Sequence, residues 1–101
     1  MSKPNPLTPD EAEKRIRLIL KNGRVKLSLH CRFESMPRRS VDYQDVVNVL
    51  STGSIVRTPE WSDAHQQWKY LVEGVDLEGD DLTTVTVMVE ADLTLIIVTV
   101  F

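Results

Sequence analysis

Two runs of alternating apolar residues close the chain and limit what it can fold into. The runs are LTTVTVMVE, residues 82–90, and LTLIIVTVF, residues 93–101. Period-two alternation predicts two long β-strands, and the intervening residues 90–92 predict a turn. The second run has apolar residues at both odd and even positions. It therefore predicts a strand that is central or covered on both faces.

Two shorter segments before these runs also predict strands. SIVRTPEW, residues 54–61, reads as a strand that breaks at Pro59, and WKYLVEGV, residues 68–75, reads as a second strand. Between them WSDAHQQ predicts a loop, and DLEGDD, residues 76–81, predicts a turn because Asp and Gly favour turn conformations. The second half of the chain is therefore expected to be a sheet.

The first half begins with a helix signal. In LTPDEAEKRIRLILKNG, residues 7–23, Thr8 can cap a helix and Glu11 completes a capping box, and Asn22-Gly23 marks the end. The expected buried face consists of Ala12, Ile16, Ile19 and Leu20.

A strand and two further helices are expected next. Residues 24–29 alternate apolar and polar side chains, which predicts a strand with one wet face. Residues 30–39 predict a short helix with Phe33 and Met36 inward and a bend or end at Pro37. Another helix starts at a capping Asp42, with Asp45 three residues on, and its expected buried residues are Val46, Val47 and Leu50.

The resulting order, α-β-α-α-β-β-β-β, predicts an α+β fold with the N-terminal helices packed on one face of a mainly antiparallel sheet. Residues 8–101 are expected to form a single domain, because 101 residues with 42% hydrophobic composition fit one core. Residues 1–7 contain two prolines and predict a flexible arm.

Charge divides the chain into two unlike parts. Residues 1–39 hold ten Lys or Arg against four Asp or Glu, whereas residues 40–101 hold two against eleven. The split indicates one surface for an anionic partner, or a basic helix whose charge is offset by neighbouring acidic loops. A surface for an anionic partner is therefore expected in the basic half.

The chain gives no membrane or disulfide signal. Its start, MSKPNPLTPDEAEK, lacks the apolar stretch of a signal peptide, and LIIVTVF is too short to span a bilayer. A single cysteine, Cys31, allows no intrachain disulfide and favours a reducing compartment. We expect a cytoplasmic protein with no membrane partner and no cofactor.

Several segments together resemble a known layout. NGRVKLSLH, MPRR, SVDYQDVVNVLSTGSIV, QWKYLVEG and the closing IIVTVF resemble an uncharacterised family of small bacterial domains of unknown function. That family is similar in layout to the RelE, BrnT and MqsR types of ribonuclease toxin from toxin–antitoxin pairs. The resemblance covers residues 11–101 and implies an RNA-binding cleft on the sheet and a cognate antitoxin as partner.

The resemblance also implies a chemistry. Such toxins cleave RNA without metal, by pushing the ribose 2′-OH onto the adjacent phosphate, which requires a base, cations and an acid. His30 matches the histidine that the resembling family places after its first strand. The candidate catalytic residues are His30, Arg32, Lys69 and Tyr70. The candidate RNA-binding residues are Lys14, Arg15, Arg17, Lys26, Arg38, Arg39 and Trp68.

Each candidate also has a structural interpretation. In the structural interpretation, the His30 side chain caps the following helix. Arg38 and Arg39 form ion pairs with Asp42 or Asp45 in the same interpretation. Lys69 and Tyr70 are consecutive in a strand and therefore point to opposite faces.

Trp68 and Tyr70 share a face, and they either stack on bases or belong to the core.

A metal site of His30, Cys31 and His65 matches no standard zinc spacing, so no metal is expected. The hypothesis set against the ribonuclease is a non-catalytic module that binds a protein. The oligomeric state is left open.

Overall fold

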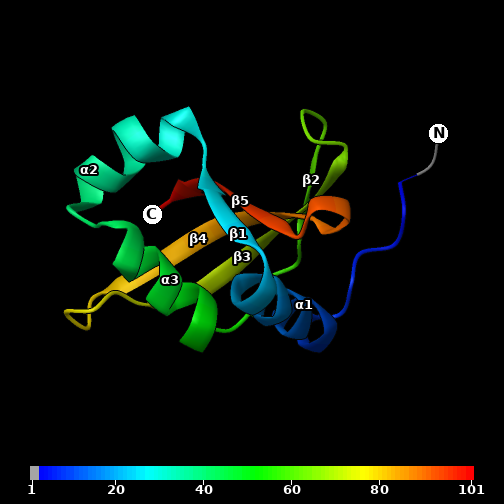
Figure 1. Ribbon diagram of the computed structural model, residues 1–101, viewed down its shortest axis with the longest axis horizontal. Helices are drawn as coiled ribbons and strands as arrows, with labels where there is room; N and C mark the ends of the chain where they lie inside the picture. Colours follow the sequence, from blue (N-terminus) through cyan, green and yellow to red (C-terminus); the bar gives the residue numbers. More distant parts are fainter. Residues whose placement is uncertain (1–2) are drawn as a thin grey trace.

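A five-stranded sheet forms the frame of the fold (Figure 1). The computed structural model describes residues 3–101, and its strands lie in the order β1-β5-β4-β3-β2. Among the strands of residues 3–101, β1 and β5 pair in parallel and the other neighbouring strands are antiparallel. The strands are β1 Arg24–Leu27, β2 Glu60–Ser62, β3 Gln67–Val75, β4 Asp81–Val89 and β5 Thr94–Val100. The mainly antiparallel sheet is confirmed, and β5 is an interior strand between β1 and β4, next to the edge strand β1.

Two capped helices lie against this sheet, α1 (Pro9–Asn22) and α3 (Tyr43–Thr52). Each starts with the expected reciprocal capping box: Thr8 with Glu11 for α1, and Asp42 with Asp45 for α3. The local sequence signals for both helix starts are therefore confirmed.

The core lies between these two helices and one face of the sheet. Residues of α1 and α3 form one cluster with residues of β3, β4 and β5, and the expected α+β class is confirmed. The cluster members that are at most 1% exposed are Ala12, Ile16, Cys31, Val46, Val49, Leu50, Leu82, Leu95 and Ile97. We call the other face of the sheet, which α1 and α3 do not cover, the open face.

The segment between β1 and α3 differs from the expectation. It is helical, but its middle is a five-residue π-helix, η1 (Cys31–Ser35), followed by the short α2 (Met36–Arg39). Met36 is buried as expected, whereas Phe33 is 67% exposed, so its expected inward position was wrong. The wide π-turn, in which the Met36 N–H donates to the Cys31 carbonyl, turns Cys31 and Ser35 inward instead.

The predicted strand over residues 54–61 is mostly absent. Ser54 makes an isolated bridge to Glu73, and regular pairing starts only at β2. In α3, Val49 is fully buried, whereas Val47 is only half-buried. A 3₁₀ turn, η2 (Glu90–Asp92), joins β4 to β5 where a turn was expected.

Of the expected N-terminal arm, residues 1–2 lie outside the described residues, and two hydrogen bonds join the rest to β3. The Leu7 N–H donates to the Tyr70 hydroxyl at 2.9 Å, and Trp68 Nε1 donates to the Pro4 carbonyl at 2.7 Å. Within residues 3–101, no helix has the length and apolar character needed to cross a membrane.

Candidate functional site

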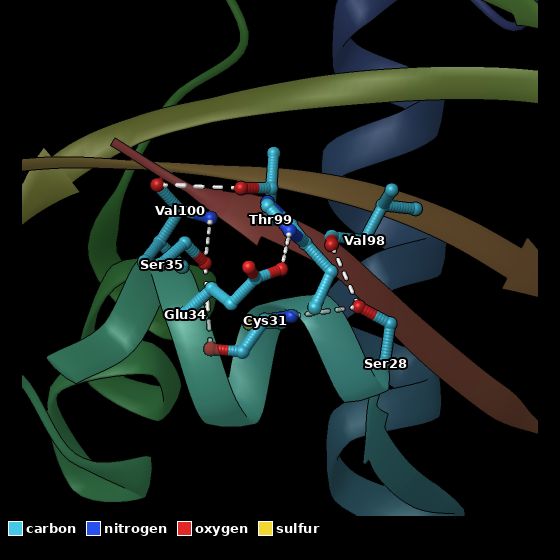
Figure 2. A network of polar contacts seen from close by, with 8 residues as sticks. Ser28, Cys31, Glu34, Ser35, Val98, Thr99 and Val100 are labelled. Atoms are coloured by element: carbon cyan, nitrogen blue, oxygen red, sulfur yellow. Dashed lines mark hydrogen bonds and ion pairs between the residues drawn. The ribbon is translucent and has the colours of Figure 1, made fainter. Parts of the chain in front are cut away.

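The helix after β1 packs against the edge of β5 through serine side chains (Figure 2). Ser28 Oγ donates to the Val98 carbonyl at 2.7 Å and accepts from the Cys31 N–H at 3.0 Å. Ser35 Oγ accepts from the Val100 N–H at 3.2 Å. Because β1 ends at Leu27, these hydroxyls replace the missing strand partner along the last residues of β5.

The His30 side chain therefore does not cap the helix. Its side chain makes no capping hydrogen bond, and Ser28 satisfies the helix start instead, so the capping interpretation of His30 was wrong. His30 Nδ1 lies 2.7 Å from Glu34 Oε2, and the two side chains are 53% and 59% exposed. A carboxylate only accepts hydrogen bonds, so Nδ1 is the donor, and in the neutral ring the lone pair is on Nε2.

Two cations of β1 point away from the core. Val25 and Leu27 pack on the core, so the alternate residues Arg24 and Lys26 point to the open face and are exposed. We call Arg24, Lys26, His30 and Glu34 the His30 site.

The helix after β1 carries His30 and Glu34 on one flank. Arg32 and Met36 share one flank of the helix, and Met36 faces the core. The flank with His30 and Glu34 is the opposite one, so it points away from the core, as Lys26 does on β1. Arg32 is exposed and lies on the flank that also carries Met36. It therefore does not share a side of the helix with His30.

Arg24 was missing from the sequence prediction, although the same alternation that placed Lys26 on the wet face of β1 also includes Arg24. Its Nε donates to Thr94 Oγ1 at 3.2 Å.

The two candidates on β3 are separated from His30 and from each other. Tyr70 pairs with Thr86, and Thr86 with Ile97, which in turn pairs with Leu27. Three strand spacings of about 4.8 Å put Lys69 about 14 Å from Lys26, on the same open face. Tyr70 points to the core side, as expected for a neighbour of Lys69, and is 5% exposed. The four candidate catalytic residues do not form one cluster.

The aromatic side chains of β3 lie beneath the N-terminal residues. A cleft of about 370 Å³ is lined by Pro4, Asn5, Leu7, Gln66, Gln67, Trp68, Tyr70, Met88 and Glu90. Tyr70 belongs to the core cluster and Trp68 packs against it, so the core interpretation is confirmed for both. Burial raises the pKa of Tyr70, and the nearby Glu90 and Glu11 carboxylates raise it further.

The cations of α1 lie on the helix-covered side of the sheet, away from Lys26. Arg15 forms an ion pair with Glu90. Arg17 donates to the carbonyls of Ser51 and Gly53, at 3.2 and 2.9 Å, and so closes the C-terminal end of α3. Lys14 is exposed on the same helix.

The arginines of α2 do not pair with the acids that were expected. Arg39 Nη2 donates to the Asp81 carbonyl at 2.5 Å, and Arg38 is exposed. Asp42 and Asp45 instead cap α3, and among residues 3–101 neither makes an ion pair with Arg38 or Arg39.

The residues of the rejected metal site lie in unlike places. Cys31 is fully buried and burial raises the pKa of its thiol, whereas His65 Nδ1 lies 3.0 Å from Ser62 Oγ in the turn after β2. In the described part of the chain, no group of three His, Cys, Asp or Glu side chains could hold a metal ion.

Comparison with known proteins gives one match. A search of the curated proteins finds no match, and neither does a search of the solved structures. The family model of a domain of unknown function, DUF4258, matches residues 27–101, which include β1's last residue, the His30 helix and all later strands. Because the match covers well over half of the sequence, the chain belongs to the DUF4258 family.

Proposed function

We propose that this domain is a metal-independent endoribonuclease of the toxin–antitoxin type, which binds single-stranded RNA at the His30 site in the bacterial cytoplasm. One observation carries the proposal: an exposed histidine, unused by capping or the core, has its Nδ1 2.7 Å from the Glu34 carboxylate. A carboxylate-oriented imidazole is a common arrangement for proton transfer. Arg24 and Lys26, which also point away from the core, supply positive charge.

The proposed reaction assigns one role to each group. His30 Nε2 removes the proton of the ribose 2′-OH, and the 2′-oxygen attacks the adjacent phosphorus. Lys26 stabilises the extra negative charge on the phosphorane, and Arg24, which lies farther along β1, contacts a neighbouring phosphate of the RNA. The bond from phosphorus to the 5′-oxygen then breaks, and that oxygen takes a proton from water. The products are a 2′,3′-cyclic phosphate and a 5′-hydroxyl end.

The experiment compares purified full-length variants on a labelled single-stranded RNA at low salt, with and without a chelator. We expect cleavage that a chelator does not change, with cyclic phosphate ends, and a loss of about 100-fold or more in His30→Gln, the size of a general-base effect. His65→Gln is the matched control and should cleave normally. RNA binding without cleavage, or equal cleavage by His30→Gln, contradicts the assignment.

A second candidate function, protein binding, is favoured by another observation. Leu29 and Phe33 lie one turn apart beside His30 and are 74% and 67% exposed. Large apolar side chains exposed together often mark a protein contact. A cognate antitoxin is the partner that we propose for a ribonuclease of this type. A purely protein-binding domain would leave the labelled RNA intact in the experiment above.

A further inference from the structure

The outer edge of β1 carries unpaired backbone groups. Arg24 N donates to the Leu93 carbonyl and Ser28 N to the Ile97 carbonyl, so the even-numbered residues of β1 face β5. In a parallel pair the alternate residues point their N–H and C=O groups the other way. Val25 and Leu27 therefore point these groups outward, and β1 has no other strand beside it among residues 3–101. Such an edge can pair with another chain.

Leu29 and Phe33 continue this edge. On the helix after β1, Cys31 and Ser35 face β5, as Figure 2 shows. Leu29 and Phe33 lie on the opposite side of that helix, so they point away from β5, in the direction of the free edge of β1. A partner segment that paired with β1 and continued past the end of the strand would contact both Leu29 and Phe33.

The positive charges beside this edge favour an acidic partner segment. Arg24 and Lys26 alternate on one face of β1, where side chains opposite them would lie within about 5 Å. Acidic side chains at those positions would be favoured. A second copy of this chain paired through β1 would instead place Arg and Lys opposite Arg and Lys, which is unfavourable.

We propose that β1 accepts an extended acidic segment of a partner protein as a sixth strand. Asp or Glu side chains of that segment face Arg24 and Lys26, and apolar residues that follow cover Leu29 and Phe33. Backbone hydrogen bonds to Val25 and Leu27 supply affinity, and the side chains supply specificity. The proposal rests on the free edge of β1 and the side chains beside it, and it does not depend on RNA cleavage.

The test uses the full chain and a labelled short peptide in which Glu alternates with Val before two final Leu residues. We expect binding, measured by fluorescence anisotropy, together with slowed amide exchange at Val25 and Leu27. A peptide with Lys in place of Glu should bind at least about tenfold more weakly, as should the Glu peptide to Leu29→Ser or Phe33→Ser. Leu18→Ser, which changes an exposed apolar residue of α1, should bind normally.

Three results would overturn the proposal. One is no binding up to about 1 mM peptide. Another is equal binding of the Lys peptide or an equal loss in Leu18→Ser, because either would show nonspecific contact. The third is slow exchange of the Val25 and Leu27 amides without peptide, in a sample that sediments as a dimer, because the edge would then belong to a second copy.

Discussion

Replacing Ser35 by alanine tests how the His30 helix is held on the sheet. The Ser35 hydroxyl accepts from the buried Val100 N–H and donates to the Cys31 carbonyl, and the residue is 5% exposed. Alanine leaves the Val100 N–H inside the protein without its partner. A buried donor that loses its acceptor costs about 1–3 kcal/mol, whereas the missing hydroxyl leaves little empty volume. We therefore expect Ser35→Ala to lower the free energy of unfolding by about 2 kcal/mol.

Urea unfolding, followed by tryptophan fluorescence, measures this loss. For a small protein the free energy of unfolding falls by about 1–3 kcal/mol per molar urea, so the midpoint should fall by about 1 M with an unchanged slope. Ser51→Ala is the control, because its exposed hydroxyl bonds only within α3. Equal midpoints for Ser35→Ala, Ser51→Ala and the wild type would refute the role given to Ser35.

Three further predictions concern other parts of the fold. Gly23→Ala should lower the free energy of unfolding by about 3 kcal/mol in the same assay, because its Cβ would lie 1.8 Å from the Leu93 carbonyl oxygen; an unchanged midpoint would contradict that contact. The pKa of the Tyr70 hydroxyl is raised in the folded state, so the unfolded chain loses the hydroxyl proton at lower pH than the folded protein. The free energy of unfolding should therefore fall as pH rises above about 10. Tyr70→Phe should lose that part of the pH dependence. The buried Cys31 thiol should react with a disulfide reagent only after urea unfolds the chain, and fast reaction of the folded protein would contradict its burial.

Local signals in the sequence predicted the two capped helices and the long strands. Thr8 with Glu11, and Asp42 with Asp45, each satisfy backbone donors within one turn, so no distant residue is needed to place them. The pairing of β1 with β5 joins segments about seventy residues apart, and no local pattern specifies it. The interior position of β5, between β1 and β4, was predictable only because both of its faces carry apolar residues.

The helix after β1 shows why the candidate site was harder to predict. A regular α-helix would put Phe33 and Met36 on one face, but the π-turn adds a residue and sends Phe33 outward. The inward positions go to Cys31 and Ser35, and the Ser35 hydroxyl satisfies a β5 N–H that the sequence does not reveal as unpaired. Tyr70 was grouped with His30 by resemblance, and strand order separates them.

The most direct test of the ribonuclease proposal is the growth of a bacterial culture after induction of this chain alone, compared with His30→Ala. The account predicts growth arrest by the wild type and normal growth with His30→Ala, at equal levels of folded protein. Normal growth with folded wild type would contradict the toxin proposal, and equal arrest by both proteins would contradict the role of His30.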